Sequence, residues 1–203
     1  MGDTHMDLLI PVEKTSDILP AVRDTPIQTL LRYHNLGAPH LTYDKAELLV
    51  GMCMDHRERL RIPENFAYIL RAAGGNLRYS EFQISYAIAI GGVSAIALLA
   101  HTQCGMVNLM SQRQPFIEGL VRRGGWEQEW AESHFMNSVS MFEIGNELDF
   151  LRTEAMRLRL RYPKIPVVPL LYRVEDNRLY HVREEAVTAR MDSLASGRRL
   201  KAL

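Results

Sequence analysis

The chain has 203 residues, of which 47% are hydrophobic and 24% are charged, which is ordinary for a globular protein with room for one domain and a hydrophobic core. Lysine plus arginine and aspartate plus glutamate both number 24, so charge gives no reason to expect nucleic acid or an anionic membrane as a partner. No stretch holds the roughly 18 uninterrupted apolar residues of a membrane span, and two cysteines are too few for a disulfide scaffold.

Residues 1–45 mix short apolar runs with prolines, and we expect them to form an N-terminal helical arm. Their start lacks the basic and apolar segments of a secretory signal, which together with the few cysteines favours a reducing, cytoplasmic location. The stretch TPIQTLLRYHNLG predicts a helix with Thr25 as its N-cap, Pro26 at its first position and Gly37 near its end.

From Ala46 onward the chain carries continuous apolar runs, which suit strands buried on both faces of a parallel sheet. The first three runs are ELLVGMCM, FAYILRA and AIALLAH, with a helix predicted over YSEFQISYAIAIGGV between the second and the third. Mostly helical sequence follows from Met106 to Tyr162. IPVVPLLYRV gives a fourth strand, expected at an edge because of Pro166 and Pro169, and NRLYHV gives its hairpin partner.

This order predicts an α/β domain over residues 46–182. Its central sheet is expected to be mainly parallel in the order 2-1-3-4, with an antiparallel last strand and flanking helices. The first crossover is close to the minimum of about a dozen residues and contains Pro63, so it is not expected to hold a full helix. Residues 183–203 are polar and predict a helical or frayed C-terminal tail.

Both cysteines and one histidine stand where predicted strands end. Cys53 ends the first strand, His101 ends the third, and Cys104 follows three residues later. If the two strands are neighbours, their carboxyl ends meet at the edge where open α/β sheets bind ligands. Zinc prefers thiolate and imidazole ligands, and three of them with an open fourth position is the arrangement of a catalytic zinc site. The alternatives are cysteines that only fill the core or a disulfide between them.

The same residues carry a resemblance to a known family. CMDHR matches the C-x-D-x-R motif, and HTQCGM the H-x-x-C-G motif, of the β-class carbonic anhydrases, with the C-G-M of the small microbial members. ILRAAGGNLR resembles the family's R-N-A-G segment, with Ala72 in place of asparagine, and LLYRVEDNRLYHV is similar to its last strand pair. The resemblance spans Glu47 to Val182.

The resemblance implies that Cys53, His101 and Cys104 bind Zn²⁺ and that Asp55 and Arg57 form the family's catalytic dyad. Asp55 would orient a zinc-bound hydroxide toward CO₂, while Arg57 would hold Asp55 ionised and turned away from the metal. Without that hold, Asp55 could swing in as a fourth ligand and close the site. The implied enzyme is a carbonic anhydrase, a zinc lyase that reversibly hydrates CO₂ to bicarbonate.

The resemblance also implies a homodimer or a higher homo-oligomer, in which the N-terminal helix embraces the partner and both protomers supply pocket residues. Two other functions fit the same motifs. One is a hydrolase of carbonyl sulfide or carbon disulfide, because the same family fold hosts such enzymes. The other is a zinc-binding protein closed by Asp55, with four protein ligands, no exchangeable water and no anhydrase activity.

Overall fold

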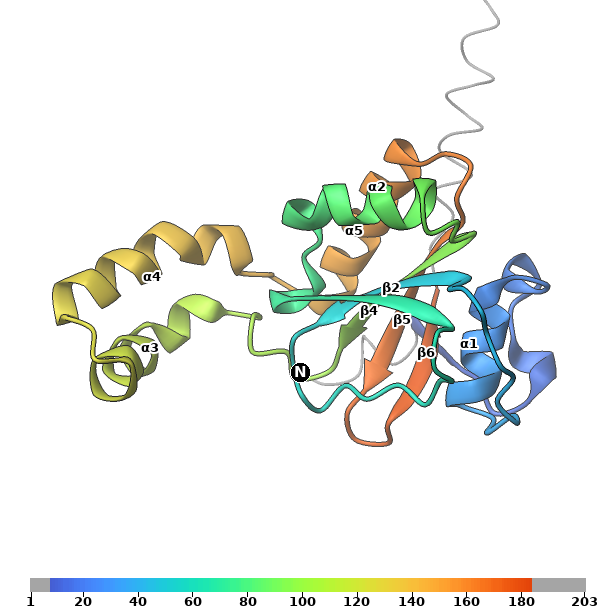
Figure 1. Cartoon of the computed structure of the whole chain (residues 1–203). Coiled ribbons are helices and arrows are strands. Elements are labelled where there is room, and N and C mark those ends of the chain that lie inside the picture. Colours follow the sequence, from blue (N-terminus) through green and yellow to red (C-terminus); the bar gives the residue numbers. More distant parts are fainter. Residues whose placement is uncertain (1–7, 184–203) are drawn as a thin grey trace, which may run out of the picture.

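The computed structural model describes residues 8–183, so the predicted tail over 183–203 lies, apart from its first residue, outside the described part. A six-stranded sheet in the order β1-β6-β5-β4-β2-β3 forms its centre (Figure 1). The strands are β1 (Leu9–Pro11), β2 (Leu48–Cys53), β3 (Ala67–Ala72), β4 (Ala95–His101), β5 (Val167–Arg173) and β6 (Arg178–Val182). Strands β3, β2, β4 and β5 are parallel to one another. Strand β6 is antiparallel to β5, and β1 is antiparallel to β6. The predicted α/β fold is confirmed, including the strand order and the antiparallel partner of the fourth predicted strand.

Five α-helices accompany the sheet in the described residues, and three of them cover it. They are α1 (Pro26–His34), α2 (Glu81–Ala89), α3 (Arg113–Gly119), α4 (Gln128–Phe142) and α5 (Glu147–Arg161). Helix α1 lies on one side of the sheet, and α2 and α5 lie on the other (Figure 1). The N-cap of α1 is the predicted one, because the hydroxyl of Thr25 accepts the N–H of Ile27 at 3.2 Å.

Successive residues of the central strands pack into opposite layers. In β2, Leu48 and Val50 join the core on the α1 side, whereas Leu49 joins the core that α2 and α5 cover. All six residues of β2 and all seven of β4 are buried. Burial on both faces explains why these strands are continuous apolar runs without alternation.

One expectation about the sheet was wrong. Strand β5 is not at an edge, because it lies between β4 and β6. Pro169 is tolerated because the pairing of β6 with β5 begins only at Leu170, so no strand needs a Pro169 N–H on that side. The edges are β3, where the predicted order places the second strand, and the short β1, which was not predicted. The crossover over residues 54–66 contains no helix, as Pro63 predicted.

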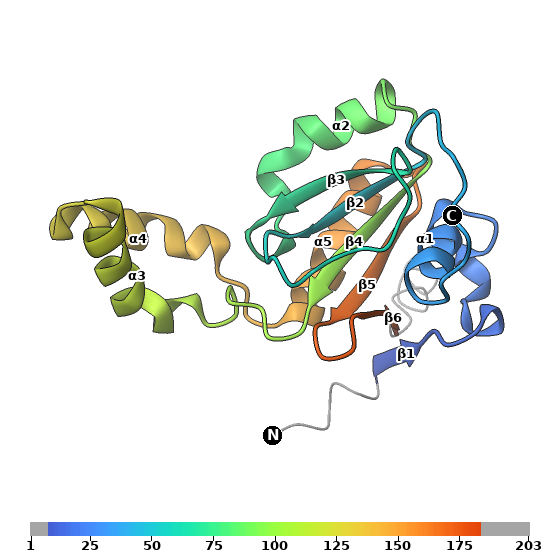
Figure 2. The same ribbon diagram turned by 60° about the horizontal axis from the view of Figure 1, so that its bottom comes forward.

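Helices α3 and α4 extend away from the sheet as a hairpin (Figures 1 and 2). They pack against each other, with the rings of Phe116 and Phe135 5.1 Å apart. The chain then returns to the sheet through α5, whose N-cap Asn146 accepts the N–H groups of Leu148 and Asp149. Within residues 8–183, no helix combines the length and the apolar character needed to cross a bilayer.

Candidate metal centre

Three predicted ligands meet at the carboxyl edge of the sheet. Cys53 is the last residue of β2, His101 is the last residue of β4, and Cys104 lies in the turn that follows. Because β2 and β4 pair in parallel, their ends reach the same edge. One donor atom from each of the three side chains lies within 4.8 Å of the others, and all three residues are buried. The spacing and the donor types suit one metal ion.

His101 has the form that binds a metal. Its Nδ1 lies 2.9 Å from the carbonyl oxygen of Thr102, and donation of the Nδ1 proton to that acceptor leaves the Nε2 lone pair free. Nε2 is buried and has no hydrogen-bond partner. An unpartnered buried nitrogen is costly, and a cation between it and the two sulfurs would compensate it. The residues therefore fit a bound metal.

The two thiols are electrostatically coupled. The hydrogen bond from Cys104 lowers the pKa of Cys53, and the backbone N–H groups of Asp55 and Gly74 act in the same direction. The same bond raises the pKa of Cys104, because two adjacent thiolates without a cation would repel each other. A divalent ion would remove that repulsion, and two thiolates would neutralise its charge.

Asp55 lies beside this centre, in the loop after β2, and Arg57 holds its carboxylate. The guanidinium donates from Nε to Oδ1 at 3.0 Å and from Nη2 to Oδ2 at 2.6 Å, and the Arg57 backbone N–H donates to Oδ1 at 2.9 Å. These bonds hold the pKa of Asp55 well below its usual range. The same carboxylate lies only 3.9 Å from His101 Nε2. A small rotation would therefore bring Asp55 to the metal position.

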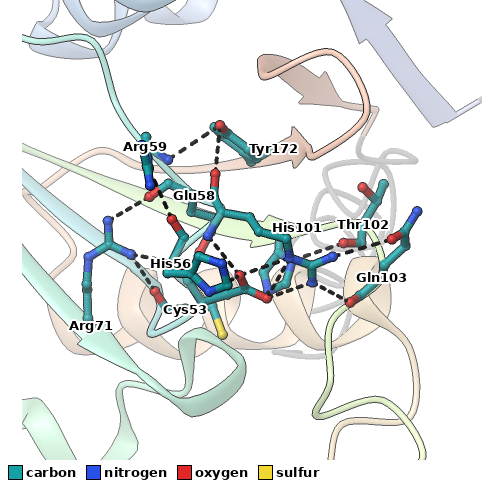
Figure 3. A network of polar contacts seen from close by, with 11 residues as sticks. Cys53, His56, Glu58, Arg59, Arg71, His101, Thr102, Gln103 and Tyr172 are labelled. Atoms are coloured by element: carbon teal, nitrogen blue, oxygen red, sulfur yellow. Dashed lines mark hydrogen bonds and ion pairs between the residues drawn. The ribbon is translucent and has the colours of Figure 1, made fainter.

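The loop that carries this pair is tied down by residues that were not predicted to serve the site (Figure 3). Arg71, on β3, donates to the carbonyl oxygens of Cys53 at 2.9 Å and Glu58 at 2.8 Å. The hydroxyl of Tyr172, on β5, accepts the N–H of Arg59 at 3.4 Å and lies 3.2 Å from the Arg57 carbonyl oxygen. Both anchors stand at the carboxyl ends of sheet strands, and Arg71 also lies in the segment ILRAAGGNLR; these are the sequence signals that could have indicated them.

Glu58 is a second unpredicted feature of this loop. Its side chain is buried, and neither carboxylate oxygen has a hydrogen-bond partner. Burial raises the pKa of Glu58 to about 8, because the charged form loses its hydration. Glu58 is therefore expected to be a neutral carboxylic acid at neutral pH.

Fold and centre together define a class: a mainly parallel α/β protein with a buried Cys–His–Cys cluster at its carboxyl edge. No protein-family model and no curated protein matches the sequence. Among solved structures, a β-carbonic anhydrase of Trichomonas vaginalis aligns with 78% of this chain and 94% of its own, with a TM-score of 0.57 and 17% identity. A carbonic anhydrase of Streptococcus mutans aligns with 81% of this chain and 99% of its own, with a TM-score of 0.53 and 20% identity.

A carbon disulfide hydrolase in its apo form also aligns, with 85% of this chain and 95% of its own, at a TM-score of 0.50 and 20% identity. The chain thus has the fold of the β-carbonic anhydrases, and the predicted resemblance is confirmed at the level of fold and buried Cys–His–Cys cluster. The ligand and dyad roles of the individual residues remain predictions.

The first prediction concerns metal binding. We expect one zinc ion per chain. Loss of a residue that only supports a metal ligand weakens metal binding by roughly 10- to 100-fold. Removal of a ligand itself, in Cys53→Ala, His101→Ala or Cys104→Ala, should weaken zinc binding by more than that. Chelator competition and metal analysis after dialysis measure this. His56→Ala is the control, because His56 is next to Asp55 but its side chain is 88% exposed. Wild-type affinity in all three variants would contradict the assignment.

The second prediction concerns Glu58 and the pH dependence of stability. Between its ordinary pKa of 4.5 and about 8, the folded chain keeps a proton on Glu58 that the unfolded chain has lost. The free energy of unfolding should therefore fall as pH rises through this interval, by at most about 1.4 kcal/mol per pH unit. Glu58→Gln should lack this component and be more stable than the wild type at pH 8.

Denaturant unfolding at pH 5, 6.5 and 8 tests this prediction. Glu64→Gln is the matched control, because Glu64 is an exposed glutamate of the same crossover. Equal pH slopes in the wild type and Glu58→Gln would show that Glu58 is ionised in the folded chain.

Proposed function

We propose that this chain is a zinc enzyme that interconverts CO₂ and bicarbonate. The observation that carries the proposal is the convergence of Cys53, His101 and Cys104 within 4.8 Å, with the Asp55 carboxylate 3.9 Å from His101 Nε2. Zinc held there would supply Lewis acidity, which makes water reactive near neutral pH. A centre with three protein ligands leaves one position for that chemistry.

The chain's own contribution is to place an ionised carboxylate beside that position. Asp55 is kept ionised by Arg57, so it can only accept a hydrogen bond. Accepting from the attacking water would direct the oxygen lone pair toward a CO₂ molecule on the other side. In this structure Asp55 is bound to Arg57 through two of its donors, which favours the enzyme over a zinc protein closed by Asp55.

The donor set also bears on the pH dependence. Two thiolates from Cys53 and Cys104 would give a bound ion more electron density than imidazoles, so the ion would be a weaker Lewis acid and would make water reactive less completely at neutral pH. Activity is therefore expected to rise toward alkaline pH.

Hydrolysis of carbon disulfide is the second candidate, and the observation that favours it is the alignment with a carbon disulfide hydrolase. Carbon disulfide and CO₂ are both linear triatomic molecules, and the same centre could activate water toward either. Asp55 and Arg57 would have the same roles in both reactions, so only assays with each substrate separate the two.

The third prediction is catalytic. Zinc-loaded chain should hydrate CO₂ in stopped-flow assays, faster at pH 8.5 than at pH 7. Cys53→Ala should be inactive for want of metal, and Asp55→Asn should lose roughly 100-fold or more because the amide cannot replace the carboxylate acceptor. His56→Ala is the control and should keep most of the activity.

A flat profile from about pH 6 to 9 would contradict the pH argument. No activity at either pH, with zinc bound, would contradict the anhydrase proposal. Assays with carbon disulfide and carbonyl sulfide would then decide whether the site is a hydrolase.

We also propose that the chain forms a homodimer through β3 and α2. Among residues 8–183, no strand pairs with the outer side of β3, and an unpaired sheet edge readily adds a strand from another chain. Beside it, Phe82, Tyr86 and Ile90 repeat every fourth residue along α2 and its end, and they are 79%, 50% and 71% exposed. Such an apolar stripe next to an open edge indicates a protein interface, and a second copy can match both features by two-fold symmetry.

The fourth prediction tests this interface. Wild-type chain should have twice the monomer mass in sedimentation or light-scattering measurements, and Phe82→Asp should shift it to monomer because a buried, unpaired carboxylate opposes association. Leu41→Asp is the control, since Leu41 is 66% exposed but belongs to the segment after α1. A Phe82→Asp protein that stays dimeric would place the interface elsewhere. Helix α1 packs on its own sheet here. The prediction that the N-terminal helix embraces the partner is therefore independent of the proposed interface through β3 and α2.

A further inference from the structure

Hydrogen bonds to one carboxylate join the turn between β5 and β6 to the turn that follows β4. Glu175 accepts a hydrogen bond from the Thr102 hydroxyl at 2.8 Å and another from the Gln103 side-chain nitrogen at 3.0 Å. The Thr102 hydroxyl also accepts the backbone N–H of Val174 at 3.0 Å. Glu175 thus holds the side chains of both residues that separate His101 from Cys104.

Gln103 also contacts Arg57. Its side-chain oxygen lies 3.4 Å from Arg57 Nη1, and its backbone oxygen accepts from Nη2 at 3.0 Å. A carboxylate only accepts and a guanidinium only donates, so Glu175 on one side and Arg57 on the other fix the Gln103 amide in a single orientation. Gln103 also has a φ of 58°, in the left-handed region where a side chain is strained. Contacts on both sides compensate that strain.

Arg57 is consequently held by two residues, Asp55 and Gln103. Nε and Nη2 of its guanidinium donate to Asp55, whereas Nη1 and the shared Nη2 donate to Gln103. The Arg57 side chain is 38% exposed, so the contact with Asp55 alone would compete with water and with the entropy of a long side chain. The two contacts from Gln103 reduce that freedom.

We propose that Glu175 is a positioning residue that, through Gln103, keeps Arg57 on Asp55 and so controls how readily Asp55 can turn toward the metal centre. The catalytic consequence rests on the proposed function, whereas the positioning does not. Asp55 needs little movement, because its Oδ2 is 3.9 Å from His101 Nε2. When Glu175 is removed, the Gln103 amide can turn and Arg57 loses its side-chain acceptor, while the Gln103 backbone oxygen still accepts from Nη2. Arg57 then holds Asp55 less firmly.

The experiment compares Glu175→Ala with Asp176→Ala in the full-length chain. Asp176 is a matched control, since it is an acidic residue of the same turn that pairs with Arg173, as Glu175 also does, but it accepts from the Tyr180 hydroxyl rather than from Thr102 and Gln103. The first readout needs no metal and no activity: hydrogen exchange of the Arg57 side-chain Nε–H, followed by ¹⁵N NMR on the metal-free protein.

Glu175→Ala should accelerate this exchange by up to about tenfold, as for the loss of one typical intramolecular hydrogen bond. Asp176→Ala should leave it unchanged. Glu175→Gln should be intermediate, because one amide oxygen can replace only part of a carboxylate that accepts from two donors. Exchange that is equally slow in wild type and Glu175→Ala would overturn the proposal, as would equal acceleration by Asp176→Ala.

The second readout concerns the loaded protein. Glu175→Ala should change the visible absorption of the cobalt(II)-substituted chain toward that of a site with an additional carboxylate ligand, and it should lower kcat by on the order of tenfold. An unchanged cobalt spectrum with fast Arg57 exchange would overturn the control over Asp55. A wild type without activity, combined with the expected exchange and spectra, would remove the proposed reaction but leave Glu175 as the positioning residue.

Discussion

The parallel pairing of β2 with β4 is the constraint on which the metal centre depends. It brings Cys53 and His101, which are 48 residues apart in the sequence, to one edge of the sheet. Both strands are buried on both faces, so their ends cannot shift without moving two cores. Cys104 then needs only the short turn after β4 to complete the cluster. The rigidity of the sheet is therefore what would keep the donor atoms close enough for one ion.

The polar groups around the cluster form layers outward from this edge. Asp55 is closest, Arg57 holds Asp55, and Gln103 holds Arg57 from the other side. Arg71 and Tyr172 fix the backbone of the same loop (Figure 3). Asp55 and Arg57 both lie in the loop after β2, Gln103 lies in the turn after β4, and Arg71 and Tyr172 stand near the carboxyl ends of β3 and β5. The loop can thus carry a carboxylate next to the metal position without collapsing onto it.

Sequence reasoning predicted the fold well where burial dictates the pattern. Strands β2 and β4 could be predicted from the sequence because both of their faces are covered. The order of the strands next to them follows from the crossovers that connect them. It failed at β5, where Pro169 is accommodated because the pairing with β6 begins only at Leu170, and at β1, whose three residues carry too little pattern to detect. The partner of β1 is β6, which lies at the other end of the described residues.

The same limit applies to the site. Asp55 and Arg57 are two residues apart, so their contact is local and a motif can contain it. The contacts of Arg71, Gln103 and Glu175 depend on which turns lie side by side, which no local spacing reveals. Glu58 was missed for another reason: a glutamate in a charged stretch predicts an exposed side chain, and only the packed loop shows it buried without a partner.

The most direct test of this account is a crystal structure of the zinc-loaded chain near pH 7. The account predicts one zinc ion bound by Cys53, His101 and Cys104, a fourth ligand that is not a protein atom, and Asp55 still paired with Arg57. A zinc ion bound elsewhere would contradict the metal centre. An Asp55 carboxylate on the metal, with Arg57 released, would contradict the open site that the proposed reaction needs.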